Sequence, residues 1–225
     1  MKKTLLSIIS WLAVTLTSFG QVDPNKHIDE GKVEGNIYIS QEIGWTIEIP
    51  KGWIVTEKAK MKEMNEKGLK ALEETIDGPI DVSGLKNLIA FEKNAFNNFQ
   101  STSELFELEY EGEWEANHAA VKDVIYETIQ NQGIKIDSTA TKIETIDGLD
   151  FHTYTFTIYD PKGNVILKQR MFSRLINGFD FGVNISYNNF RDGTELLELF
   201  RNSKFKKWNV VLNERFYAVE SFRVE

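Results

Sequence analysis

The densest group of potential ligand atoms in this chain is a run of glutamates at every second position. The run comprises Glu107, Glu109, Glu111, Glu113 and Glu115. On a strand, the first three carboxylates would share one face at a spacing of about 7 Å, and calcium needs several oxygen ligands. Carboxylates at this spacing do not converge without help from a loop, and the last two fall in a predicted helix. We therefore interpret the run as a solvated strand face, offset by a basic strand carrying Lys168, Arg170 and Arg174, and assign no metal-binding residues.

The three histidines form no catalytic or metal-ligating pattern. His152 shares a predicted strand face with Tyr154 and is interpreted as a core or sheet-edge residue. His118 lies one helical turn before Lys122, a spacing typical of an exposed helix face, and His27 lies in a polar segment. A nucleophile elbow, a phosphate loop and a His-Glu-x-x-His motif are all missing from the sequence. We assign no catalytic or cofactor-binding residues and expect no cofactor, with a hydrolase built on two of the 34 acidic residues as an alternative.

The first twenty residues have the pattern of an export signal. Lys2 and Lys3 precede an apolar stretch over residues 5–16, and small residues lead to an expected cleavage after Gly20. The stretch is too short for a retained membrane span. Cleavage would leave 24 basic and 34 acidic residues, a balance that argues against nucleic acids and anionic membranes as partners. The chain has no cysteine, so neither disulfides nor a lipid-anchoring cysteine are available, and we expect a soluble periplasmic or secreted protein.

Strand and helix patterns alternate along the rest of the chain. Residues 21–35 read as a flexible polar arm, and the apolar spacing predicts helices over 57–76, over 114–129 and from Asp192 onward. Turn signals separate the predicted strands, which cover residues 37–40, 45–49, 87–93, 102–111, 134–146, 149–159, 165–175 and 179–187. The last four, joined by tight turns, predict an antiparallel meander.

The register of the last hairpin depends on the length of its loop. A two-residue loop at Asn177 and Gly178 would place Arg170 and Arg174 on the same face as Phe181. A three-residue loop with a bulge would instead place Met171 and Leu175 on that face. We favour the bulged loop, because it keeps the arginines away from the apolar face.

Three short motifs are shared with a known superfamily. They are Pro50-Lys51-Gly52-Trp53 after the first hairpin, Ile146-Asp147-Gly148, and Ser203-Lys204-Phe205 after the last helix. In this order, over residues 37–205, the chain resembles the PsbP-like superfamily, which includes the extrinsic PsbP subunit of photosystem II, periplasmic DcrB proteins and a small Ran-binding import factor. The resemblance implies a central antiparallel sheet with helices on both faces and mostly non-enzymatic binding roles. The lipid-anchoring cysteine of DcrB-type proteins is missing here, and neither photosynthesis nor Ran binding is carried over.

The sequence thus predicts an α+β protein, an α/β/α sandwich with a mainly antiparallel sheet, as one domain over residues 36–205. A C-terminal extension, residues 206–225, is expected to pack as an extra strand or to dock a partner. We predict a non-enzymatic binding or accessory protein of the cell envelope with a protein partner. One alternative is a chaperone-like protein that holds apolar client segments in a groove between sheet and helix. The other is the hydrolase, which requires a histidine and carboxylates to converge in a cleft.

Overall fold

The computed structural model describes residues 24–206. The predicted signal peptide and residues 207–225 of the predicted extension lie outside this range. Three helices are described: α1 (Lys58–Ile76), α2 (Glu113–Asn131) and α3 (Phe190–Asn202), together with a short 3-10 turn, η1 (Pro24–His27). Among these residues, every helix is too short or too polar to cross a lipid bilayer.

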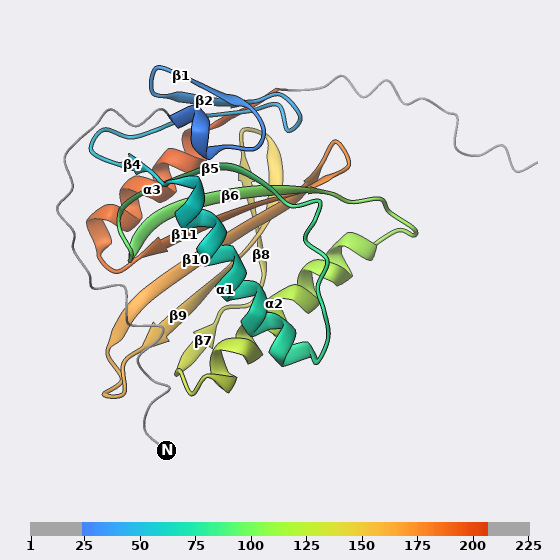
Figure 1. The fold of residues 1–225 in the computed structure, drawn as a ribbon, viewed down its shortest axis with the longest axis vertical. Helices are drawn as coiled ribbons and strands as arrows, with labels where there is room; N and C mark the ends of the chain where they lie inside the picture. Colours follow the sequence, from blue (N-terminus) through green and yellow to red (C-terminus); the bar gives the residue numbers. More distant parts are fainter. Residues whose placement is uncertain (1–23, 207–225) are drawn as a thin grey trace, which may run out of the picture.

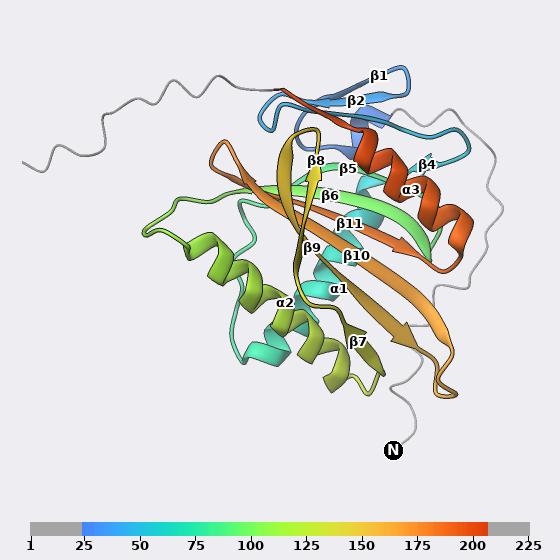
Figure 2. The same cartoon turned by 180° about the vertical axis from the view of Figure 1, so that it is seen from behind.

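The main structural element is a large antiparallel sheet in the order β4-β5-β6-β11-β10-β9-β7, with β8 also paired to β9. Its strands are β4 (Ile54–Val55), β5 (Lys86–Asn94), β6 (Asn97–Leu105), β7 (Ile136–Ser138), β8 (Lys142–Ile146), β9 (Leu149–Tyr159), β10 (Val165–Ile176) and β11 (Phe179–Tyr187). A small sheet contains β1 (Lys32–Glu34), β2 (Ile37–Ser40), β3 (Trp45–Glu48) and β12 (Lys204–Phe205). Helix α3 and the small sheet lie on one side of the large sheet, and α1 and α2 lie on the other (Figures 1 and 2). The predicted α+β architecture is therefore confirmed.

Trp45 is the centre of the main core. Its indole ring is fully buried and contacts rings from the small sheet, the large sheet and α3, including those of Phe99, Phe181 and Phe200. Alternation along β3 directs Trp45 and Ile47 to the same side, so the predicted strand buries its apolar face. Strand β3 thus packs the small sheet on the large sheet around one aromatic core.

The opposite face of the large sheet is polar over its central strands β6 and β11. Its central strands present amides, hydroxyls and carboxyls toward α1 and α2, among them Asn98, Gln100, Thr102, Glu104, Asp180, Asn184 and Ser186. The amide of Gln100 lies 3.8 Å from the sulfur of Met64 on α1, which places this face beneath that helix. An apolar groove between sheet and helix, which the chaperone alternative requires, therefore does not form over these strands.

The predicted register of the last hairpin is wrong. Asn177 and Gly178 form a two-residue turn with positive φ values of 54° and 80°, and Ile176 pairs directly with Phe179. Such a turn matches the twist of the flanking strands without a bulge. Arg170 and Arg174 therefore lie on the face of Phe181. They are accommodated there because the first binds Glu144 and the second donates to the carbonyl of Asp150.

The described part of the expected N-terminal arm packs on the domain. Asp29 accepts hydrogen bonds from the backbone and side-chain amides of Asn87, and Glu30 accepts from the backbone amides of Gln41 and Glu42. Strand β1 follows and pairs with β2. These residues therefore belong to the folded domain rather than to a flexible arm, because their carboxylates find backbone donors.

Candidate functional site

The first three glutamates of the run lie on a loop, where a strand was predicted, and Glu113 and Glu115 lie in α2, as predicted. Strand β6 ends at Leu105, and Glu107, Glu109 and Glu111 follow on the loop of residues 106–112. The strand stops because its partner β11 begins at Phe179: the amide of Phe106 already bonds to the carbonyl of Gly178 in the hairpin turn. Among residues 24–206, no strand continues beside the loop, so alternation along it does not produce a ladder.

Large apolar side chains are exposed on the loop and at the end of the strand that precedes it. Leu105 is 60% exposed, Leu108 is 52% exposed and Tyr110 is 60% exposed. We call these three residues, together with Glu107, Glu109 and Glu111, the acidic–apolar surface. Within residues 24–206, none of its three carboxylates takes part in an ion pair.

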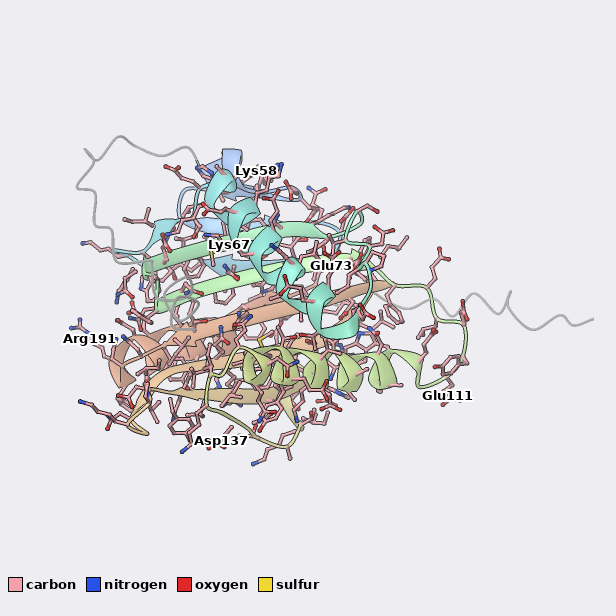
Figure 3. All side chains as sticks on the ribbon, turned by 60° about the horizontal axis from the view of Figure 1, so that its bottom comes forward. Lys58, Lys67, Glu73, Glu111, Asp137 and Arg191 are labelled. Carbon is pink, nitrogen blue, oxygen red and sulfur yellow. The ribbon has the colours of Figure 1, made fainter. Side chains whose placement is uncertain are left out.

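The predicted basic partner strand does not compensate this charge. Arg170 pairs with Glu144 on β8, and Arg201 on α3 joins the same carboxylate. Figure 3 shows Glu111 and Arg191 at opposite ends of the molecule. The acidic charge of the loop is therefore left for solvent or for a partner.

Both ends of the loop are fixed to the domain. At its start, Phe106 bonds to Gly178, and at its end Gly112 adopts the left-handed conformation (φ 85°) that begins α2. The carboxylate of Glu113 in the first turn of α2 accepts the amide of Glu109 at 2.6 Å. The loop thus presents its side chains from a defined backbone rather than from a free segment.

Trp114 anchors the first turn of α2 to the sheet. Its side chain is buried, and its Nε1 donates to Oδ1 of Asp180 on β11 at 2.9 Å. Burial raises the pKa of Asp180, and the indole hydrogen bond partly opposes this shift. Burial and the charges of Asp180 and Asp81 likewise raise the pKa of Glu104 on the neighbouring strand.

His118 lies one turn beyond Trp114, beneath the helix. It is only 7% exposed, and its ring centroid lies 5.4 Å from that of Trp114, 5.4 Å from that of His152 and 5.5 Å from that of Tyr154. The prediction that His118 occupies an exposed helix face is therefore wrong. Positions 114 and 118 are one turn apart and share the face that packs on β9, whereas Val121 is exposed. The interpretation of His152 as a residue on the face of Tyr154 is correct.

The surroundings of His118 favour the neutral imidazole. Burial, together with the positive charges of His152 and Lys122, lowers the pKa of His118 to about 4. Its Nε2 is buried without a hydrogen-bond partner among residues 24–206. Among the described residues, Nε2 therefore has no acceptor, and the neighbouring charges disfavour the cation of His118.

The two histidines and Asp180 lie beneath the first turns of α2. The two histidines meet, but the carboxylate of Asp180 is engaged by Trp114, and Nε2 of His118 is inaccessible. In the part of the chain that the structure describes, no three His, Asp or Glu side chains are placed to hold a metal ion. A shallow surface hollow lies elsewhere, at the end of α1. It is lined by Lys70, Glu73, Glu74, Asp77, Gly78 and Pro79.

Comparison with known proteins identifies the fold. No protein-family model and no curated protein sequence matches the chain. Among solved structures, the solution structure of cyanobacterial PsbP (CyanoP) from Synechocystis sp. PCC 6803 aligns with 85% of this chain and 99% of its own, at a TM-score of 0.50. The chain has a PsbP-like fold. The two proteins share 13% of their residues, so this similarity concerns the fold alone.

The PsbP-like fold confirms the resemblance drawn from the three sequence motifs. All three motifs lie in the core or in a turn between strands. Trp53 is buried after β3, Asp147 and Gly148 form the turn between β8 and β9, and Phe205 on β12 packs on Trp45. They are thus determinants of architecture. Neither Trp114 nor Asp180 was assigned to a site from the sequence, and His118 was predicted on an exposed helix face. The i, i+4 spacing of Trp114 and His118 was the available signal that both face the sheet.

Proposed function

We propose that this protein is an exported, non-enzymatic accessory protein of the cell envelope that docks a basic protein partner through its acidic–apolar surface. The pattern of residues 1–20 supports export, and the PsbP-like fold fits an accessory or binding protein. The observation that carries the proposal is the exposure of Leu108 and Tyr110 between unpaired carboxylates on a loop fixed at both ends.

The chemistry of this surface defines its partner. Exposed tyrosine and leucine side chains supply apolar contact area, and aromatic residues are enriched in the cores of protein interfaces. The surrounding carboxylates favour a cationic partner and accelerate its approach. A partner segment with basic residues flanking apolar ones would match both features, and its affinity should fall as the salt concentration rises.

Site-specific photo-crosslinking tests the proposal. The mature protein would carry benzoylphenylalanine at position 110 or, as a matched control, in place of Phe190, an aromatic residue that is 88% exposed at the start of α3. After exposure to envelope extract, the proposal predicts a defined adduct from position 110 that position 190 does not give. The captured protein would then be produced separately for affinity measurement.

The affinity of that protein decides the outcome. The expected result is at least tenfold weaker binding to the Leu108→Ser variant and unchanged binding to a Val165→Ser variant, which alters an apolar residue that is also half-exposed but lies on β10. Equal crosslinking from both positions, or equal loss of affinity in both variants, would show that the partner binds elsewhere.

A further inference from the structure

The inference concerns regulation of the acidic–apolar surface and rests on the function proposed above. His118 is a basic side chain buried between α2 and β9, with no hydrogen-bond partner for Nε2 among the described residues. Its ring is enclosed by Trp114 on its own helix and by His152 and Tyr154 on the sheet. A buried imidazole without partners is tolerated while it is neutral, but a proton on it would create an uncompensated buried charge.

The charged groups around His118 would not stabilise its cation. On α2, Lys122 extends over the ring of Tyr154 at 5.2 Å, so a second positive charge is close by, and Asp123 is exposed. On β9, the ring of His152 lies 5.4 Å from that of His118 and also disfavours the charged form. On β11, Asp180 is engaged by the indole of Trp114, and Glu104 lies beside it on β6. A charged His118 therefore gains most by leaving the interface for water.

The rest of α2 is held independently of His118. Ile125 and Ile129 pack against the small cluster around Phe156, and the hydroxyl of Thr128 bonds to that of Thr75 on α1 at 2.9 Å. Release of His118 would therefore loosen the first two turns of the helix and leave the second half in place. Those first turns carry Trp114 and Glu113, which hold the end of the acidic loop.

We infer that protonation of His118 detaches the first two turns of α2 and the acidic loop with them, so that the surface engages its partner at neutral pH and releases it in acid. An exported protein meets the pH of its surroundings directly, so such a response would follow the external medium. The burial of His118, the absence of a partner atom and the hydrogen bonds from α2 to the loop together carry this inference.

The sign and size of the effect follow from proton linkage. The pKa of His118 is about 4 in the packed helix and about 6.5 when it is released, so the released form binds the proton more tightly. Packing is fully favoured above pH 6.5 and is progressively lost as the pH falls toward 4. The opening equilibrium constant should rise about 30-fold between pH 7.5 and pH 5. The raised pKa values of Asp180 and Glu104 act in the opposite direction, because these groups take up protons in the packed state.

Hydrogen exchange of the free, mature protein tests the inference. Protection factors, corrected for the intrinsic rate at each pH, would be compared for amides of residues 114–121 and for those of α3. In the wild type, protection over 114–121 should fall about 30-fold from pH 7.5 to pH 5 relative to α3. The variant His118→Phe keeps an aromatic ring without the titration and should lose less than threefold. The control His152→Phe should retain at least a tenfold response.

Two outcomes would overturn the inference: an equal pH response in wild type and His118→Phe, or no response in the wild type. If His118→Phe does not fold, NMR titration of the imidazole of wild-type His118 provides the test. A titration midpoint at or below pH 5 supports the inference, and a midpoint above pH 5 contradicts it. Hydrogen exchange is measured without a partner, so a negative result would refute the pH response of α2 without testing the proposed docking function. The binding of the Leu108→Ser variant at pH 7.5 tests the latter alone.

Discussion

Replacing Trp114 by phenylalanine should weaken the attachment of α2 to the sheet through the loss of a single hydrogen bond. The indole Nε1 donates to Oδ1 of Asp180 at 2.9 Å, and the tryptophan side chain is buried. Phenylalanine would keep an aromatic ring beside His118 but has no donor for the carboxylate. The variant therefore separates the hydrogen bond from the bulk of the aromatic packing.

The expected cost has two parts. A hydrogen bond to a charged group contributes about 1.5–3 kcal/mol to stability, and the buried ring atoms lost from indole to phenyl add about 1 kcal/mol. The total at pH 7.5 is about 3 kcal/mol in the free energy of unfolding. Because the indole hydrogen bond lowers the pKa of Asp180, its removal should raise that pKa further. The cost should therefore shrink as the pH falls, since the mutant then binds its extra proton in the folded state.

A double-mutant cycle with Asp180→Leu measures the interaction itself. Urea unfolding of the four proteins at pH 7.5 should give a coupling energy of about 1.5–3 kcal/mol between positions 114 and 180. The matched control is Trp53→Phe, a buried tryptophan whose Nε1 has no partner among the described residues and which packs on Phe91. That change should add to Asp180→Leu within about 0.5 kcal/mol. A coupling below this value between positions 114 and 180 would refute the role given to the hydrogen bond.

Two further predictions concern α3 and its support. In Gly193→Ala, the added Cβ would clash with the ring of Tyr187, so the free energy of unfolding in urea should fall by about 2 kcal/mol. In the control Gly68→Ala, nothing lies within 4 Å of the added Cβ, and the free energy of unfolding should rise by about 0.5–1 kcal/mol from helix propensity. Lys93 lowers the pKa of Asp192. The ion pair therefore stabilises the fold above the ordinary carboxyl pKa, and this stabilisation is lost as the pH falls through the lowered pKa. The variant Lys93→Met should therefore be destabilised by about 1 kcal/mol at pH 7 and by less at pH 2.5, and an equal loss at both values would contradict this.

The fold followed from the sequence because its signals are local. Apolar spacing predicted α1 and α2, and turn signals such as Asp147-Gly148 and Asn177-Gly178 separated the strands of the meander where the structure has them. The register of the last hairpin failed because it depends on distant partners. Arg170 forms an ion pair with Glu144 on the face of the apolar core. Alternation along a single strand cannot predict this contact, because Glu144 lies on another strand.

The site was less predictable for the same reason. The end of β6 is set by where β11 begins, so the loop at residues 106–112 could not be recognised from the alternation of its own residues. The hydrogen bond between Trp114 and Asp180 joins residues 66 positions apart. The exposure of Leu108 and Tyr110 depends on the same long-range pairing, since no strand is available to cover them. Sequence supplied the residue types at this surface, and tertiary pairing determined what they face.

The most direct test of the proposed docking surface is the affinity of the crosslinked partner for a charge-reversed loop. The triple variant Glu107→Lys, Glu109→Lys and Glu111→Lys changes exposed side chains and should leave urea unfolding within about 0.5 kcal/mol of the wild type. Calorimetry at physiological salt should show binding weakened about 100-fold, equivalent to about 2.7 kcal/mol. Unchanged affinity in a folded triple variant would contradict the proposal that a basic partner docks on the acidic–apolar surface.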